Sequence, residues 1–445
     1  MSEFFQSIVE SPILQALAII LGIAAPAFGI VMWVIKSAKN KNQKPVNFKQ
    51  SQEEFVIINK KFGGLNRTQI SRIAHSINLD YLKDEKFLPL EELPLLCIDR
   101  WIPEKPVPLE SISCSLIDEK APELNPVKLS LPYTDEQNHF PLYTSAVKEL
   151  LKPKIFEDNR QYRFLDLESD GSNFQFNISR KPYSYFYKIN YGKGVQHELI
   201  SELLRINKID LFDDVFSFDK TPKIKSLPFR RKVLEGLKNT ETFNHTVVLG
   251  GVSTLTLLYD GNSFRFLLHE RGSGQGYAAN IRHVIPAGEY QPLSKGDNFS
   301  KDLPLWNNTM REYAEELGNL EEFKGEEGKI FDYSKTSPFS DYLREVEQGN
   351  IKNFFLGFGL DPLSLQAEVV SVSIFKEDTF NELFGPTPFT NNDEGVIITE
   401  ADRWGIPFTK EEVDQRLEEG LLAAGDSALR LAFKHLEFLK NSMDN

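Results

Sequence analysis

The most hydrophobic stretch of the chain is residues 13–35, which read ILQALAIILGIAAPAFGIVMWVI and carry no charged side chain. A helix of about 20 apolar residues is long enough to cross the hydrocarbon core of a bilayer. No Lys or Arg precedes this stretch, and four lysines follow it closely: Lys36, Lys39, Lys41 and Lys44. Because basic residues mark the cytoplasmic side, the pattern predicts a single-pass protein of the inner (cytoplasmic) membrane with its N-terminus outside. A buried helix of a globular core is the alternative.

The rest of the chain alternates between strand-like and helical patterns. Residues 174–191 are rich in the aromatic residues of strands, whereas residues 197–206 have apolar positions at helical spacing. We find no internal repeat. The expected division is a transmembrane segment at 1–36, a basic linker at 37–54, an α+β domain of unknown kind at 55–244 and a further domain at 245–445.

The middle domain holds two features that could bind a ligand. One is a group of aromatic residues: Tyr183, Tyr185, Phe186, Tyr187 and Tyr191. The other is a basic cluster: Lys220, Lys223, Lys225, Arg230, Arg231 and Lys232. Stacking faces with positive charge suit a nucleotide or a short oligonucleotide. The alternative, which is more common, is a strand core beside a solvated basic face.

The C-terminal domain shows strands and helices in succession. Asp260-Gly261-Asn262 joins two apolar runs, which is a strong hairpin signal. Residues 354–375 read as two strands around a turn, and residues 391–404 as another strand. Thr409 and Glu412 form a capping box that begins a helix. The whole pattern indicates an α/β fold.

Composition narrows the function classes. The formal net charge of −13 argues against a general binder of duplex nucleic acid, which needs Lys and Arg to neutralise phosphates. Cys97 and Cys114 are the two cysteines of the chain, and neither they nor the seven histidines have the spacing of zinc ligands. A zinc site is therefore not expected.

The segment from Trp306 to Gly318 carries the clearest chemical signal. Its apolar residues recur at helical spacing: Trp306, Met310, Tyr313, Ala314 and Leu317. Its acidic residues share the opposite face of that helix: Glu312, Glu315 and Glu316. Three carboxylates within one turn repel one another unless a cation neutralises them, and Mg²⁺ or Mn²⁺ is the natural candidate. A solvated acidic face is the alternative.

The same residues resemble the signature of the Nudix hydrolase superfamily, which ends in Arg-Glu-apolar-x-Glu-Glu-x-Gly. Arg311, Glu312, Glu315, Glu316 and Gly318 match that half in register. Pro286-Ala287-Gly288-Glu289 resembles the glycine turn that precedes it in the family. The resemblance covers roughly residues 245–440 and implies an α/β/α sandwich, with Glu312, Glu315 and Glu316 as metal-binding and catalytic residues and Gly288 at the substrate.

The sequence departs from the family between the turn and the helix, where the interval from Gly288 to Arg311 is nine residues longer. Leu303 stands where the family has a glutamate, and Asp297 or Asp302 could replace it, although neither is in register. The family often takes a further metal-binding carboxylate from a later segment, for which the candidates are Glu368, Glu394 and Glu400. We favour Glu394.

The resemblance implies two functions of different classes. One is hydrolysis of a nucleoside diphosphate linked to another moiety, with Arg271 or Arg282 contacting phosphate. The other is a sensor that binds a nucleotide or cyclic oligonucleotide without cleaving it, because a membrane segment before a Nudix-like domain is similar to effectors of bacterial CBASS antiphage signalling. In that reading the transmembrane helix lies in the bilayer, forms homo-oligomers and delivers the response. The longer interval favours the effector, and the hydrolase is the alternative.

Overall fold

A computed structural model describes most of the chain after residue 47, with short gaps. The described residues are 48–61, 67–83, 90, 92–120, 131–135, 137–153, 156–211, 217–238, 242–271, 282–295, 298–386, 395–398 and 403–444. The chain divides into two units, residues 1–51 with 133–138 and residues 52–132 with 139–445. In the first unit the Tyr133 amide donates a hydrogen bond to the Ser51 hydroxyl (3.1 Å). All the sites discussed below lie in the second unit.

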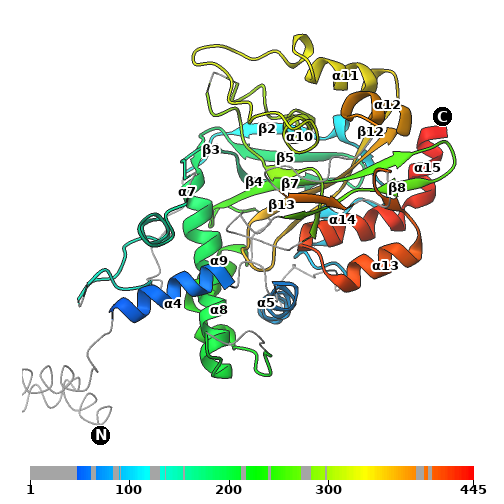
Figure 1. Cartoon of the computed structure of the whole chain (residues 1–445). Helices are drawn as coiled ribbons and strands as arrows, with labels where there is room; N and C mark the ends of the chain where they lie inside the picture. Colours follow the sequence, from blue (N-terminus) through cyan, green and yellow to red (C-terminus); the bar gives the residue numbers. More distant parts are fainter. Residues whose placement is uncertain are drawn as a thin grey trace, which may run out of the picture. The chain divides into compact units, whose positions relative to one another are not determined.

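A mixed sheet of ten strands, counted over the described residues, forms the centre of the second unit (Figure 1). Its main path runs β1-β12-β13-β7-β4-β5-β2. Off this path, β8 and β11 pair with β7, and β15 pairs with β8. Its strands are β1 (Val107–Pro108), β2 (Ser113–Ile117), β4 (Arg163–Ser169), β5 (Phe174–Ser179), β7 (Val248–Tyr259), β8 (Phe264–Phe266), β11 (Ala287–Glu289), β12 (Ile351–Leu360), β13 (Ala367–Lys376) and β15 (Ile406–Pro407). β7 pairs in parallel with β13 and antiparallel with β4, β8 and β11.

The long central strand β7 is buried along its entire length, which explains its nearly continuous apolar sequence. Asp260-Gly261 turns the chain from β7 into β8, with Gly261 at a φ of 92° that favours glycine. This confirms the hairpin expected from the sequence. β12 and β13 form the second expected strand pair.

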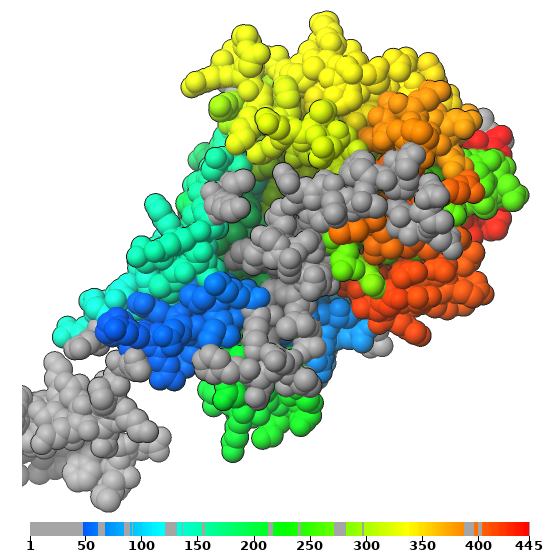
Figure 2. Space-filling model, in the orientation of Figure 1, coloured from blue at the N-terminus to red at the C-terminus, as the bar shows by residue number. Residues whose placement is uncertain are grey.

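Helices cover both faces of this sheet. α10 and α12 pack on one side of β7, and α14 packs on the other (Figure 1). In Figure 2 the yellow surface at the top belongs to the segment with α11, and the orange to red surface on the right belongs to the C-terminal helices. The α-helices are α4 (Phe48–Lys61), α5 (Arg67–Leu82), α6 (Tyr143–Ala146), α7 (Tyr185–Lys188), α8 (Gly194–Asn207), α9 (Pro228–Leu237), α10 (Leu305–Glu312), α11 (Phe339–Glu347), α12 (Glu377–Phe384), α13 (Lys410–Glu419), α14 (Ala423–Lys434) and α15 (Leu436–Asp444).

Short elements complete the fold. Two π-helical turns continue the helices that matter for the site, η4 (Ile189–Lys193) after α7 and η6 (Tyr313–Leu317) after α10. A smaller sheet has the order β10 (Arg282–Val284), β9 (Leu268–Arg271) and β14 (Gly395–Ile398). The remaining elements are β3 (Arg160–Gln161), β6 (Tyr183–Ser184), η1 (Asp99–Trp101), η2 (Leu109–Ser111), η3 (Val147–Leu151), η5 (Ile224–Ser226) and η7 (Tyr333–Lys335).

Strands from both sides of the expected boundary at residues 244–245 join in the ten-stranded sheet. Arg163 and Phe164 of β4 pair with Leu249 and Val248 of β7. Residues of both halves also contribute to one hydrophobic core. The part of the chain before residue 244 therefore extends the sheet on which the C-terminal helices pack.

The expected transmembrane helix at residues 13–35 lies outside the described residues. Within the described ranges no helix is both long enough and apolar enough to cross a membrane. α5, for example, has 16 residues and includes Arg72 and Asp80, whereas a span needs about 20 apolar residues. Over the residues that the structure describes, this finding corrects two expectations, the fold class with a transmembrane helix and the location as a single-pass inner-membrane protein. What it describes is an α/β fold with a mixed sheet.

Candidate functional site

The helix that carries the acidic motif packs against the centre of the sheet. Met310, Tyr313, Ala314 and Leu317 are buried, as the apolar stripe predicts. The Tyr313 hydroxyl lies 2.7 Å from the Thr256 hydroxyl of β7, which fixes the helix on the strand. The backbone leaves the α-helical pattern at η6, where the Gly318 amide donates to the Tyr313 carbonyl (2.9 Å). Such a π-helical turn changes the direction of the side chains that follow it.

Two of the three predicted carboxylates meet the glycine turn of β11. The Ala287 amide donates to Glu316 Oε1 (3.0 Å), and Glu316 is buried. A Cβ placed on Gly288 would lie 2.0 Å from Cδ of Glu312, so Glu312 occupies the space that a side chain would take. The third carboxylate, Glu315, accepts a hydrogen bond from the Phe323 amide (3.4 Å) in the segment after the helix. The structure therefore brings Glu312, Glu316 and Gly288 together.

Arg311 anchors the helix to the inserted loop. Its guanidinium donates to Asn308 Oδ1 (2.8 Å) and to the Gln291 carbonyl, and it lies 3.7 Å from Asp302. Burial alone would lower the pKa of Arg311, but Tyr333, Asp302 and Glu312 reverse this effect and raise the pKa above its usual value. Of the two aspartates considered as replacements for the family glutamate, Asp302 is the one that meets the arginine. Asp297 lies outside the described residues.

Asp302 is completely buried and is well satisfied. Its oxygens accept hydrogen bonds from the Leu293 amide (2.8 Å), the Asn298 amide group (3.2 Å) and the Tyr333 hydroxyl (2.9 Å). These bonds tie the loop after β11 to the start of the helix. The described part of the loop after β11 is thus joined through Asp302 to Arg311 of the acidic helix.

The remaining predicted residues are less informative. Arg282 is engaged by two carboxylates, with Nε 3.2 Å from Glu270 and Nη1 bonded to Glu419. Arg271 pairs through its backbone with Gly395 in the smaller sheet, but its side chain is not described. Glu394 and Glu400 lie outside the described residues.

Carboxylate oxygens are suitable ligands for Mg²⁺ or Mn²⁺, and Glu312 with Glu316 offers such a pair. Over the described part of the chain, no group of three or more His, Cys, Asp or Glu side chains is placed to hold a metal ion. The expected set of Glu312, Glu315, Glu316 and Glu394 is not assembled in what the structure describes.

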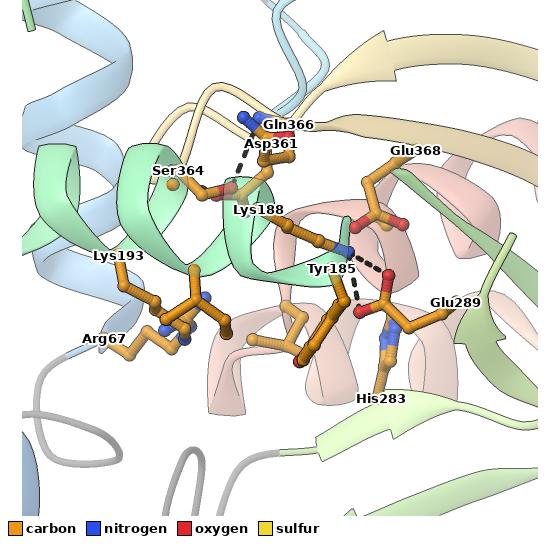
Figure 3. A pocket seen from close by; sticks show the side chains of 14 residues that line it. Arg67, Tyr185, Lys188, Lys193, His283, Glu289, Asp361, Ser364, Gln366 and Glu368 are labelled. Carbon is orange, nitrogen blue, oxygen red and sulfur yellow. Dashed lines mark hydrogen bonds and ion pairs between the residues drawn. The ribbon is translucent and has the colours of Figure 1, made fainter. Parts of the chain in front are cut away.

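A cavity of about 210 Å³ lies on the other face of the same strands (Figure 3). Neighbouring residues of a strand point to opposite faces, so Gly288 faces the acidic helix while Glu289 enters the cavity. Gly251 of β7 pairs with both Glu289 and Glu368, and its missing side chain leaves space between the two carboxylates. The polar and charged residues that line the cavity are Arg67, Tyr185, Lys188, Lys193, His283, Glu289, Asp361, Ser364, Gln366 and Glu368.

Glu368 lies at the cavity floor in a chain of hydrogen bonds. Ser253 donates to Glu368 Oε2 (3.1 Å) and lies 3.2 Å from His283 Nε2. Part of the Glu368 side chain faces the cavity, but protein surrounds it, and this burial raises its pKa to about 7. Lys188 opposes that rise, whereas Asp361 and Glu289 add to it. Glu368 was a candidate metal ligand, but the sheet separates its face from that of the acidic helix.

The opposite wall of the cavity comes from α7 and η4. The Lys188 ammonium donates to both oxygens of Glu289 (2.8 and 2.6 Å). This wall belongs to the aromatic segment at 183–191, which we expected to be strand; beyond the two residues of β6 it is helical. The sequence analysis named Glu289 only as part of the glycine turn, and it did not single out Lys188, Ser253 or His283 as site residues. The Tyr187–Tyr191 spacing of four residues was the available signal for the helix.

No family model matches the chain, and no curated protein matches it. Among solved structures, the crystal structure of a NUDIX hydrolase from Alicyclobacillus acidocaldarius is similar to 44% of this chain and 96% of that one. The two are 13% identical, with a TM-score of 0.23. With a TM-score this low the likeness carries no conclusion about fold or function, and it gives no support to a CBASS-like architecture.

Proposed function

We propose that the chain is a Nudix-like hydrolase that acts on the diphosphate of a nucleotide derivative with a divalent cation at Glu312 and Glu316. The observation that supports this most directly is the contact of both carboxylates with the Ala287–Gly288 backbone of β11. Two carboxylates held beside the Ala287–Gly288 backbone concentrate negative charge where no side chain of Gly288 intrudes. Carboxylate oxygens, together with the phosphate oxygens of a substrate, are the ligands that Mg²⁺ prefers.

The chain's own residues account for positioning. The Ala287 amide holds one oxygen of Glu316, which orients the carboxylate, and the absence of a side chain at Gly288 makes room for Glu312. Arg311 of the acidic helix and Asp302 of the loop before it lie 3.7 Å apart and hold these two segments together. When bound, Mg²⁺ would polarise the phosphate oxygens and lower the pKa of an attacking water. Glu312 or Glu315 would accept the proton of that water.

A second candidate is binding of a nucleotide or cyclic oligonucleotide without cleavage. The contact between Glu315 and the Phe323 amide favours it, because a carboxylate occupied by the following loop is less available for chemistry. The role as a CBASS-like effector has no support beyond the original resemblance, so the second candidate is limited to binding.

The test is turnover by the full chain of ADP-ribose, NADH and diadenosine polyphosphates, with Mg²⁺ or Mn²⁺, followed by chromatography of the products. We expect metal-dependent release of a nucleoside monophosphate from at least one of them. Glu312→Gln and Glu316→Gln should abolish release, and the exposed Glu347→Gln should leave it unchanged as the matched control. Metal-dependent binding without any product would favour the second candidate, and no metal dependence at all would overturn both.

A further inference from the structure

Another cavity, of about 190 Å³, lies between α5 and the start of α14. It shares no lining residue with the cavity in Figure 3. α5 lies beside the C-terminal helices (Figure 1), and a Cβ on Gly420, which follows α13, would lie 2.7 Å from Thr68 Oγ1. The walls are therefore one face of α5, the segment at residues 92–94 and residues 421–430 around the start of α14.

One face of α5 supplies polar groups to this cavity. Four side chains that can donate hydrogen bonds follow one another at i, i+3, i+4 and i+7: Thr68, Ser71, Arg72 and His75. Burial lowers the pKa of His75, although the Leu95 backbone opposes this effect. Nε2 of His75 is buried and has no hydrogen-bond partner among the described residues. A buried polar atom without a partner is unfavourable, so a ligand in the cavity is its candidate partner.

Two guanidinium groups in the cavity suit one carboxylate of a ligand. Arg430 donates from Nε to Asp426 (2.5 Å) and can still donate from Nη1 and Nη2. Burial raises the pKa of Asp426, whereas Arg430 and Arg72 oppose that rise. Arginine binds carboxylates through pairs of N–H groups. The carboxyl groups of Asp426 and Glu92 disfavour a second negative charge, so a monoanion fits the cavity better than a dianion.

The rest of the wall is apolar and limits the size of the ligand. Leu93, Pro94, Leu421 and Ala423 line the cavity beside the charged groups. They offer contacts to a short carbon skeleton, which inorganic phosphate lacks. The volume of about 190 Å³ is below the roughly 300–1,000 Å³ of pockets for drug-sized ligands. The ligand is therefore a small organic acid.

From these observations we infer that the cavity binds a small organic monocarboxylate, with its carboxylate at Arg72 and Arg430. The carbon skeleton lies against Leu93 and Leu421. The site requires no metal ion and shares no residue with the acidic helix, so it goes beyond the proposed hydrolase. It combines residues from before and after residue 244.

Saturation-transfer NMR of the full chain with lactate tests this inference, in the presence of EDTA so that no divalent cation contributes. Lactate should bind at least tenfold more tightly than lactamide, in which an uncharged amide replaces the carboxylate. Added as competitors, propionate should displace lactate at least tenfold more effectively than inorganic phosphate. The first comparison tests the negative charge of the ligand, and the second tests its carbon skeleton and single charge.

Arg72 is exposed, so its replacement should leave the fold intact. Arg72→Gln should weaken lactate binding by tenfold or more, and Arg72→Lys should weaken it less because the positive charge remains. Arg231→Gln, which removes an exposed arginine from α9, is the matched control and should bind lactate as the wild type does.

Four outcomes would overturn the inference: no binding of lactate, equal affinity for lactamide, displacement by phosphate as effective as by propionate, or the same affinity in Arg72→Gln as in Arg231→Gln. Glu312→Gln should leave lactate binding unchanged, whereas a loss there would place the ligand at the acidic helix and also contradict the inference. Failure of the hydrolase proposal is therefore distinguishable from failure of this one.

Discussion

Carboxyl groups lie on both faces of β11, but the groups that they contact differ. On one face Glu312 and Glu316 lie against backbone at Ala287 and Gly288. On the other face Glu289 is neutralised by Lys188 (2.6 Å), and burial raises the pKa of Glu368. Carboxylates that lie together beside the backbone can supply oxygen ligands to a metal ion, whereas the carboxyl groups on the other face are compensated by Lys188 and by protonation. The local partner, and not the residue type, decides what each face can bind.

On the face of β11 that carries Glu312 and Glu316, the most disruptive single change is Gly288→Ala. The added Cβ would fall on the Glu312 carboxylate, and because that carboxylate ends a flexible side chain, it should move away while the fold survives. Misplacement by about 1 Å lowers turnover by roughly a hundredfold. Metal-dependent turnover should therefore fall by about that factor. Gly328→Ala adds a methyl group that meets no neighbouring atom but strains the backbone at a φ of 72°, so it controls for general destabilisation. Equal turnover in the two variants would contradict the account.

The contact between Asp302 and Arg311, which holds the loop after β11 to the acidic helix, can be tested by its effect on the free energy of unfolding. Asp302→Ala would leave Arg311 buried without its carboxylate partner, which costs about 3–5 kcal/mol. Asp341→Ala removes one of the two carboxylate partners of the exposed Arg344 and should cost less than about 1 kcal/mol. Urea unfolding of both variants measures the contrast. Similar losses in the two would show that the buried pair does not hold the loop to the helix.

On the cavity face of the sheet, Glu368 should make the free energy of unfolding depend on pH. The folded-state pKa of Glu368, about 7, lies above its unfolded value, so folding favours the protonated form. That contribution is complete below the unfolded pKa and is lost as pH rises through 7, by about 3 kcal/mol at most. Glu368→Gln should therefore gain stability relative to the wild type between pH 5 and pH 8 in urea titrations. A difference that stays constant over this range would contradict the assignment.

Ser253→Ala is the mildest of the changes on the cavity face of the sheet. It removes the hydroxyl between Glu368 and His283 and should cost about 1–2 kcal/mol. Because Ser253 and Thr254 point to opposite faces of β7, Thr254→Val is the natural comparison; it removes the 2.8 Å contact with Ser371. Only Ser253→Ala should change how the free energy of unfolding varies between pH 5 and pH 8, because it removes a hydrogen bond to Glu368. Equal changes in both variants, measured by urea unfolding, would contradict the account.

Local patterns in the sequence predicted local structure well. The Asp260-Gly261 hairpin and the apolar stripe of α10 are confirmed, and Thr409 caps α13 by accepting from the Glu412 amide (3.4 Å). Each depends on residues a few positions apart. The expected strand around Tyr187 was wrong, because alternating aromatics resemble a strand core, whereas Tyr187 and Tyr191 stack one helical turn apart (6.1 Å between ring centroids).

The candidate site was only partly predictable. The register of the motif identified Glu312 and Glu316, and Asp302 was considered in spite of its shifted position. The cavity was not foreseen, because Arg67, Lys188, Glu289 and Glu368 come from four distant segments that only the sheet brings together. The π-helical turn at η6 also has no simple sequence signal, so the separate direction of Glu315 could not be anticipated.

The central claim is that Glu312 and Glu316 form a divalent-cation site at the glycine turn. Calorimetric titration of the full chain with Mn²⁺ alone tests it most directly, with the double variant Glu312→Gln/Glu316→Gln measured beside Glu289→Gln. The account predicts that the double variant loses Mn²⁺ binding, while Glu289→Gln, on the opposite face of the same strand, retains the wild-type affinity. Unchanged Mn²⁺ binding in the double variant would contradict the claim.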